Sequence, residues 1–410
     1  MFPILNLHGD PQQRGYQYGS QAAPQIRHSI ASYARQFAYR CGLTWQQSQI
    51  LAEGSLPWLE RHTPQMLEEI QGLATGSGFT FSEILALNLR TEILARAVSG
   101  GSHPNYAAAM EHNRQAGVPQ HPPDPIPEFD GIPPTEASPD WGECTTLAAL
   151  PQVTSTQHTY LAQTWDWIGD QRSACLVLRT HAPDYPPWLT LTEAGILAKI
   201  GLNQAGLAVT LNLLRSQQDG QTQSGGMPVH LLLRLLLQCE NWQQALERVK
   251  SYPYTASSCV SLASASGQVI SFELSPQGIG LHHPQGGLLV HTNHFLDPTL
   301  QAHELPPYVG SSTRQRLERA SYLLHQSVQR GSLDEVALQA ILQDRSDAPG
   351  SICRHPDPHL SAVDRTESVA AVAMDLNTQI LHVAPGLPDQ VEFVPISSPN
   401  DDSELPACAC

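Results

Sequence analysis

A proline-rich stretch from residue 100 to residue 142 divides this chain into two parts with different hydrophobic patterns. It contains the segments HPPDPIPEF and GIPPTEASPD, whose composition is typical of loops and linkers. Loops of this length are uncommon inside compact proteins and tend to be functional or cleavable. Because the stretch runs up to Cys144, we expect an exposed loop that leads directly to a thiol.

Helical patterns fill the chain before this loop, from Asp10 to about Ala97. One of these helices is opened by a capping box from Thr80 to Glu83. After the loop the pattern changes to the period of strands in TTLAAL, TYLAQTWDW, ACLVLRTHA, WLTLTEA, ILAKIGLN and LAVTLNLL. Successive strands separated by turns indicate an antiparallel meander.

Two pairs of helical patterns interrupt the strands in the rest of the chain. The first pair is PVHLLLRLLLQC and NWQQALERVKSY, with Asn241 as the N-cap of the second helix. The second pair covers 312–329 and 333–344, and a capping box from Ser332 to Glu335 opens the later helix. Alternating blocks of helices and strands predict an α+β fold, a four-layer α/β/β/α sandwich of two stacked antiparallel sheets.

The charge balance argues against several classes of partner. With 22 Lys+Arg against 38 Asp+Glu, the net charge is −16, and no basic cluster occurs, so a nucleic acid would be repelled. No stretch approaches the ~20 apolar residues of a membrane span, and the start MFPILNLHGD lacks a basic n-region. We therefore expect no membrane partner and a cytoplasmic location. Without a glycine-rich phosphate loop, we also expect no cofactor.

The eight cysteines are scattered and lack the paired spacing of a disulfide scaffold. Cys353-x-His355 and Cys408-x-Cys410 have no second matching pair, so we predict no metal site. Cys144 begins a strand pattern. From its position alone, a buried core thiol is the favoured interpretation.

The order of several segments adds a second argument. GDPQQRGYQYG is followed by Glu143-Cys144-Thr145, QTWDW, LTEAGILAKIGLNQAGLAVTLNLL, MPVHLLLR, HTNHF, SICRHPD and RTESVAAVAMDL. In this order and spacing, the segments resemble the acyl-coenzyme A:6-aminopenicillanic acid acyltransferase family of self-cleaving N-terminal-nucleophile hydrolases. The resemblance covers most of the chain.

This resemblance implies the N-terminal-nucleophile hydrolase fold and a zymogen that cuts itself between Glu143 and Cys144. The chain would consist of a helical part over 1–99, a linker over 100–143 and a nucleophile-bearing sandwich over 144–410. The first and last parts would stay intertwined as a heterodimer of cleaved fragments. Cys144 would form a thioester with a small acyl amide or acyl donor, and its freed α-amine, with a reference pKa of about 7.7–8.0, would act as the base. Hydrolysis of an amide C–N bond is favoured over acyl transfer because water is always available.

The resemblance also implies roles for further residues. Asp166 would lie beside Cys144 and bind the substrate or the new α-amine, and Asn212 would be a donor of the oxyanion hole. Arg365 would bind a substrate carboxylate, and Thr145 would support the amine or the maturation intermediate. Each role has a structural alternative: a backbone-bonded carboxylate for Asp166, a strand-end amide for Asn212, a surface ion pair for Arg365 and ordinary strand packing for Thr145.

Glu143 departs from the family pattern, in which well-known relatives carry a glycine before the nucleophile. A glutamate adds bulk and a charge at the scissile bond, so we expect slower self-cleavage. His291, His294 and His355 fall in family-like segments, and we interpret each as a structural histidine. Two other functions stay open: a non-catalytic scaffold that retains the fold, and a cysteine hydrolase with a histidine base and no self-cleavage.

Overall fold

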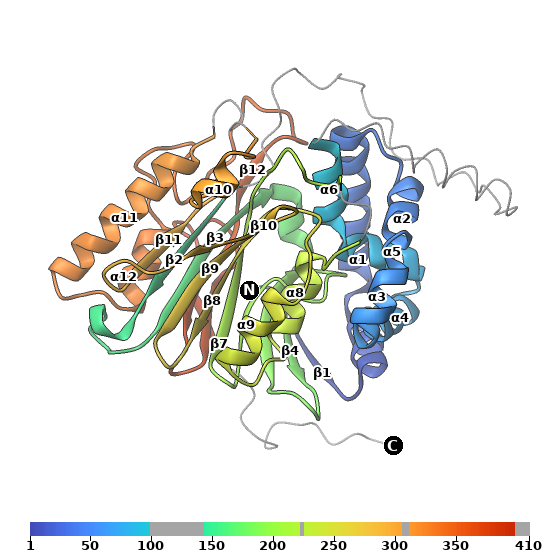
Figure 1. Cartoon of the computed structure of the whole chain (residues 1–410), viewed down its shortest axis with the longest axis horizontal. Helices are drawn as coiled ribbons and strands as arrows, with labels where there is room; N and C mark the ends of the chain where they lie inside the picture. The colour runs from blue at the N-terminus through green and yellow to red at the C-terminus, as the bar shows by residue number, and fades with distance from the viewer. Residues whose placement is uncertain (99–142, 222–224, 306–310, 398–410) are drawn as a thin grey trace, which may run out of the picture.

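The computed structural model describes residues 1–98, 143–221, 225–305 and 311–397. The expectations for the linker before Glu143 and for Cys408-x-Cys410 lie outside these residues. Two stacked β-sheets lie in the middle of the molecule, with helices on the outer side of each sheet (Figure 1). The predicted α+β fold with four layers is therefore confirmed.

The first sheet has eight strands in the order β1-β4-β5-β6-β7-β8-β9-β10. They are β1 (Ile4–His8), β4 (Cys175–His181), β5 (Trp188–Glu193), β6 (Ile200–Asn203), β7 (Leu207–Leu213), β8 (Ser258–Ser264), β9 (Gln268–Ser275) and β10 (Gly278–His282). The sequence did not predict β1, which pairs parallel with β4 at the sheet edge. This sheet is therefore not purely antiparallel, although its other pairs are.

The second sheet has six antiparallel strands in the order β11-β2-β3-β12-β13-β14. They are β2 (Cys144–Ala149), β3 (Tyr160–Ile168), β11 (Leu288–His291), β12 (Thr366–Asp375), β13 (Ile380–Ala384) and β14 (Val394–Ser397). Strands β2 and β3 lie against β7 of the first sheet. Cys144 is thus the first residue of an inner strand, next to the space between the sheets.

Most helices cover the eight-stranded sheet and share its apolar core. They are α1 (Pro11–Cys41), α2 (Trp45–Glu53), α3 (Leu56–His62), α4 (Pro64–Ser77), α5 (Phe81–Asn88), α6 (Arg90–Val98), α8 (Val229–Leu236) and α9 (Trp242–Lys250). The short α10 (Pro298–Gln301) lies near β10. Two further helices, α11 (Thr313–Gln329) and α12 (Glu335–Leu342), cover the six-stranded sheet. No described helix is both long and apolar enough to cross a membrane.

Local capping signals were mostly sufficient to place the helix starts. The Thr80 hydroxyl accepts from the Glu83 amide, and the Glu83 carboxylate accepts in return from the Thr80 amide, as expected. Asn241 caps α9 as expected. The capping box at Ser332 was wrong, because α12 begins at Glu335 with Asp334 as its N-cap.

Glycines set the distance between α1 and α4. A Cβ added to Gly19 would lie 2.2 Å from the carbonyl oxygen of Leu73, and one added to Gly76 would lie 2.2 Å from that of Tyr16. The two helices therefore touch backbone to backbone, which explains the glycine spacing of the GDPQQRGYQYG segment.

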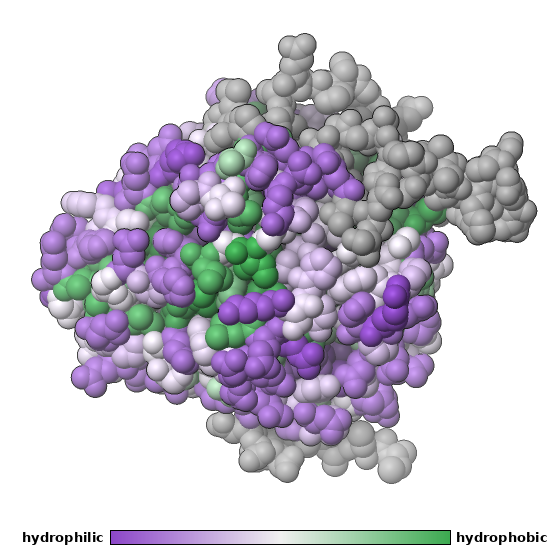
Figure 2. Space-filling model, viewed as in Figure 1, coloured by the Kyte–Doolittle hydropathy of each residue, from purple (hydrophilic) through white to green (hydrophobic). Residues whose placement is uncertain are grey.

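Hydrophobic residues also gather on the outer surface near β9 and β10, in the middle of the face that Figure 2 shows. A shallow groove there is lined by residues of β9, β10 and α9, among them Phe272, Leu281, Trp242 and Leu246. It lies on the outside of the sandwich, whereas Cys144 lies between its sheets.

From the close approach of α1 and α4 we predict that a larger residue at the contact lowers the stability of the protein. Gly19→Ala or Gly76→Ala should destabilise the protein by at least about 2 kcal/mol in urea unfolding, because the two backbones must separate. Gly54→Ala is the control, since Gly54 has helical backbone angles and its new Cβ would meet nothing closer than 3.3 Å. Equal effects at Gly76 and Gly54 would contradict this account of the contact.

Candidate active site

The backbone of Cys144 is held on both sides by side chains. Its N–H donates to Asn293 Oδ1 at 2.7 Å, and its carbonyl accepts from Asn212 Nδ2 at 3.0 Å and from Arg316 Nη1 at 2.8 Å. Its cross-strand partner is Trp165 on β3, and both belong to the core cluster between the sheets. With 5% exposure, the Cys144 residue is almost fully buried.

Asn212 is bonded at both ends of its amide, as a buried strand amide requires. Its Nδ2 donates to the carbonyls of Cys144 and His291, the latter at 3.3 Å. Its Oδ1 accepts from Thr146 Oγ1 at 2.7 Å and from Gln163 Nε2 at 3.2 Å. Both N–H groups of Asn212 are therefore committed to backbone carbonyls.

The side chain of Glu143 is fully buried in a polar pocket. Its carboxylate accepts from Ser311 Oγ at 2.8 Å, from the Ser312 amide at 3.1 Å and from Ser312 Oγ at 2.6 Å. It also pairs with Arg316 at 3.2 Å and with Arg354. The bulk and charge that distinguish this position from a glycine are thus accommodated by specific partners.

Asp166 lies beside the junction between Glu143 and Cys144, the peptide bond where self-cleavage is expected. Its amide donates to the Glu143 carbonyl at 3.0 Å, and its Oδ1 accepts from Ser368 Oγ at 2.6 Å. Within the described residues, its Oδ2 has no hydrogen-bond partner. Burial raises the pKa of Asp166 to about 7, although the two arginines that bind Glu143 and the Ser368 hydroxyl act in the opposite direction. Trp165 and Trp167 belong to the same large core cluster as Cys144, and the Trp167 indole donates to the Tyr33 hydroxyl of α1 at 3.0 Å.

Lys199 is a functional candidate that sequence reasoning missed. Its Nζ lies 3.4 Å from the centre of the Trp165 ring and 3.4 Å from Glu193 Oε2, and burial lowers its pKa to about 7. Burial raises the pKa of the Cys144 thiol to about 12, and the Asp166 charge adds to this while Lys199 opposes it. The thiol therefore needs a base before it can act as a nucleophile.

Two further predicted residues lie in different settings. Thr145 Oγ1 accepts from Arg316 Nη1 at 2.9 Å, so Thr145 belongs to the site. The Arg365 side chain donates to three backbone carbonyls of its own loop, those of residues 357, 358 and 360. Its neighbours Asp364 and Glu367 bind Tyr39 and Arg172, respectively. Arg316 and Arg354, and not Arg365, are the guanidinium groups that contact the junction.

The histidines considered as alternative bases are bound elsewhere. His291 Nε2 lies 2.7 Å from Glu273 Oε1, and Nδ1 lies 2.9 Å from the Thr292 carbonyl. Burial acts to lower the pKa of His291, but its contacts with Cys259 and Glu273 outweigh this and raise it to about 10. Burial lowers the pKa of His294 to about 4. Among the described residues, no histidine ring is hydrogen-bonded to Cys144.

The residues that were missed had signals in the sequence. Asn293 lies in HTNHF, a segment singled out for its histidines. Lys199 is the only charged residue in the apolar segment ILAKIGLN, and Arg316 lies in the first turn of α11, just after Ser311 and Ser312. A lone charge in an apolar segment was the most readable of these signals, because such a charge needs a buried partner.

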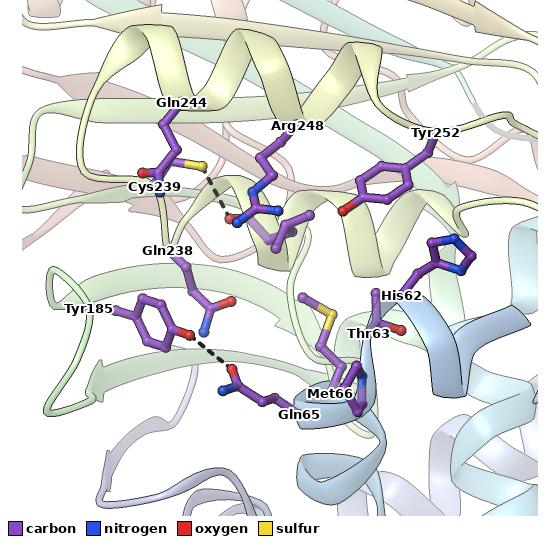
Figure 3. Close-up of a pocket in the computed structure, with 12 residues that line it drawn as sticks. His62, Thr63, Gln65, Met66, Tyr185, Gln238, Cys239, Gln244, Arg248 and Tyr252 are labelled. Carbon is purple, nitrogen blue, oxygen red and sulfur yellow. Dashed lines mark hydrogen bonds between the residues drawn. The ribbon is translucent and has the colours of Figure 1, made fainter.

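Two hollows of the described surface are lined by residues other than Cys144. One, of about 220 Å³, lies between the α3–α4 and α8–α9 regions, and Figure 3 shows Arg248, Tyr252, His62 and Gln238 around it. A smaller one, of about 30 Å³, is lined by α6 and by the residues from Leu213 onward, directly after Asn212. Since the Leu213 carbonyl accepts from Asn293 Nδ2 at 3.0 Å, the smaller hollow borders the site.

Comparison with known proteins identifies the family of this chain. Residues 153–384, more than half of the chain, match the family described as acyl-coenzyme A:6-aminopenicillanic acid acyl-transferase, and the chain belongs to this family. The acyl-coenzyme A:6-aminopenicillanic-acid-acyltransferase 40 kDa form of Emericella nidulans is 27% identical over 352 residues, which are 85% of this chain and 84% of that protein. The resemblance found in the sequence is thereby confirmed.

Two solved structures are also similar. One is a Caenorhabditis elegans ortholog of N-acylethanolamine-hydrolyzing acid amidase, with 15% identity, a TM-score of 0.43, and coverage of 57% of this chain and 93% of that one. The other is penicillin V acylase from Agrobacterium tumefaciens, with 15% identity, a TM-score of 0.40, and coverage of 59% and 82%. The layers and strand order described above define the fold independently of these similarities.

The raised pKa of Asp166 makes a prediction about stability and pH. In the folded protein the carboxyl keeps its proton up to about pH 7, whereas its ordinary pKa is 3.8, so ionisation of Asp166 lowers stability as pH rises through this window. Asp166→Asn should therefore raise Tm relative to the unmodified protein more at pH 8 than at pH 4. Calorimetry at both pH values would test this. A Tm difference that is the same at both would contradict the pKa assignment.

Proposed function

We propose that this protein is a self-processing cysteine enzyme that hydrolyses or transfers the acyl group of a small amide or thioester through Cys144. The observation that carries the proposal is a pair of hydrogen bonds to the peptide group between Glu143 and Cys144. Its carbonyl accepts from the Asp166 amide at 3.0 Å, and its N–H donates to Asn293 Oδ1 at 2.7 Å. These two hydrogen bonds would orient the peptide for attack by its own neighbouring thiol.

Maturation would begin when the Cys144 thiol loses its proton and Sγ attacks the carbonyl carbon of Glu143. The C–N bond then breaks, and the nitrogen takes up a proton to become the α-amine of Cys144. Water hydrolyses the resulting thioester, which leaves a carboxylate on Glu143 and a free thiol on Cys144. The Asp166 amide would donate to the oxyanion, while Lys199 and Arg316 favour the thiolate electrostatically.

Turnover would use the freed α-amine as the base for the Cys144 thiol. Asn293 Oδ1 is positioned to hold this amine. Within the described residues, Asn293 Nδ2 has one hydrogen bond, to the Leu213 carbonyl, so its second N–H can donate to a substrate oxyanion. We therefore assign the oxyanion role to Asn293, and we assign to Asn212, whose N–H groups are both committed, the positioning of the Cys144 carbonyl.

The two fragments would remain together after the cut. Strand β1 of the first fragment pairs with β4 of the second. Buried ion pairs also cross between the fragments, from Arg90 to Glu193 at 2.9 Å and from Arg234 to Glu69 at 2.8 Å. These contacts support a heterodimer of fragments 1–143 and 144–410.

Substrate chemistry is proposed at the level of the acyl bond. The Emericella relative is named for transfer from an acyl-coenzyme A to 6-aminopenicillanic acid. We propose amide hydrolysis as the main reaction, because water competes with every other acyl acceptor. Release of the acid from N-acyl amino acids, β-alanyl amines and penicillins, with and without an added amine, would separate hydrolysis from transfer.

Self-cleavage can be tested on a denaturing gel. The purified chain should migrate as two fragments, with N-terminal sequencing of the second giving Cys-Thr-Thr, and Cys144→Ala should stay whole because it lacks the nucleophile. Cys239→Ala is a matched control, since Cys239 borders the hollow in Figure 3 and should still be cut. An uncut protein without thiol-dependent activity would favour the scaffold function instead.

The oxyanion assignment makes a kinetic prediction. Asn293→Ala should lower kcat by about 10²–10³-fold, because one preorganised donor to the transition state is lost. Asn241→Ala removes an amide that only caps α9 and should leave kcat unchanged. To separate turnover from maturation, both variants should be assayed as chains already cut before Cys144. Full activity of the Asn293 variant would return the role to Asn212 or to a backbone amide.

A further inference from the structure

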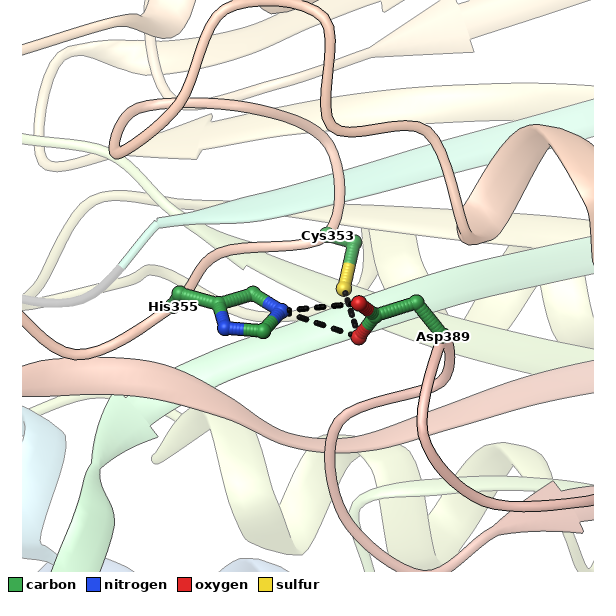
Figure 4. A group of neighbouring side chains, drawn as sticks. All are labelled: Cys353, His355 and Asp389. Carbon is green, nitrogen blue, oxygen red and sulfur yellow. Dashed lines mark hydrogen bonds and ion pairs between the residues drawn. The ribbon is translucent and has the colours of Figure 1, made fainter.

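A second cluster of reactive side chains lies on either side of Arg354, which pairs with Glu143. Cys353, His355 and Asp389 each direct a ligand-type atom to one point, and these atoms all lie within 4.8 Å of one another. His355 Nε2 is 2.9 and 3.0 Å from the two oxygens of Asp389, and Cys353 Sγ donates to Asp389 Oδ1 at 3.1 Å. Figure 4 shows the thiol and the imidazole pointing to the same carboxylate.

Two segments build this cluster. Cys353 and His355 are separated by one residue in the loop between α12 and β12, and the intervening Arg354 contacts Glu143 instead. Asp389 comes from the turn between β13 and β14. The spacing of Cys353 and His355 offered only two ligands in the sequence, and the third became visible only when the chain was folded.

The ligand chemistry favours one class of cation. A thiolate, an imidazole and a carboxylate are the ligands of zinc, whereas calcium and magnesium prefer oxygen atoms alone. Ligand atoms around a tetrahedral zinc lie roughly 3.3–3.8 Å apart. The sulfur and nitrogen atoms, which lie 3.1 and 2.9 Å from the carboxylate, would move away from it by about half an ångström, and all three ligand atoms already lie within 4.8 Å of one another. The thiol is fully buried, while the His355 and Asp389 side chains are 17% and 16% exposed, which leaves a side for a water ligand.

We propose that Cys353, His355 and Asp389 form a zinc site, with water as the fourth ligand. On binding, the Cys353 thiol gives its proton to solvent, and the hydrogen bonds to Asp389 are replaced by bonds to the metal. Arg345, whose Nη1 lies 3.2 Å from Asp389 Oδ2, would remain as an outer partner of the carboxylate.

The site would act by positioning and not by reacting. A cation bound at Cys353 and His355 fixes the loop on both sides of Arg354, whose guanidinium pairs with Glu143. The Arg354 amide also donates to Ser368 Oγ, which in turn donates to Asp166. The metal would thus stabilise the polar network that joins Arg354 to Glu143 and to Asp166, whether or not the chain cuts itself.

Metal binding can be measured directly on the full chain. Protein purified without chelator, or titrated with Zn²⁺ after chelation, should hold close to one equivalent by mass spectrometry of the metal. Co²⁺ should give a thiolate-to-metal absorption band, and adding Zn²⁺ to the apo-protein should raise Tm by at least about 2 °C. These readouts do not depend on catalysis.

Variants locate the metal. Cys353→Ser should abolish the cobalt band, and His355→Gln should lower the bound zinc at least tenfold. His158→Gln is the matched control, because His158 pairs with Asp375 at 2.8 Å but belongs to no group of three metal ligands among the described residues, and it should retain the metal. Less than about 0.1 equivalent in the unmodified protein, or a cobalt band that persists in Cys353→Ser, would overturn the proposal. If Cys353→Ser does not fold, the titration of the unmodified protein and the His355 variant still decide it.

Discussion

The candidate site depends on the interactions of one guanidinium group, that of Arg316. It is almost fully buried, and it donates to the Cys144 carbonyl, to Thr145 Oγ1 and to Asn293 Oδ1 while pairing with Glu143. It thereby joins the start of β2, the residues after β11 and the first turn of α11. A buried cation is costly unless its donors are satisfied, so this set of acceptors favours one geometry of the junction.

The neighbouring carboxyl groups of Glu143 and Asp166 differ in the number of groups that bind their oxygens. Glu143 has two arginines and two serine side chains around its oxygens, whereas Asp166 has one hydroxyl on Oδ1. Burial therefore dominates at Asp166 and raises its pKa to about 7. The Glu143 side chain is anchored by partners that a glycine at this position could not engage.

Sequence patterns were sufficient for the layers because they report local burial. The capping pairs at Thr80 and Asn241 depend on residues a few positions apart. The predicted start of α12 at Ser332 was wrong because of a contact with a distant segment. Leu333 is buried, and its carbonyl accepts from the Ser155 amide, which holds Leu333 outside the helix. Strand β1 was missed because its short edge pairing with β4 joins residues far apart in the chain.

The sequence by itself determined the α+β architecture, the family and Cys144 as the candidate nucleophile, because periodicity and ordered motifs are readable along one dimension. It also singled out Asp166 and Asn212, which lie beside Cys144 on β3 and β7. Only the tertiary structure decided that Asn293, Arg316 and Lys199 meet there, and that Arg365 does not. The physical reason is that these groups come from separate segments, which only the stacking of the sheets and the docking of α11 bring together around Cys144.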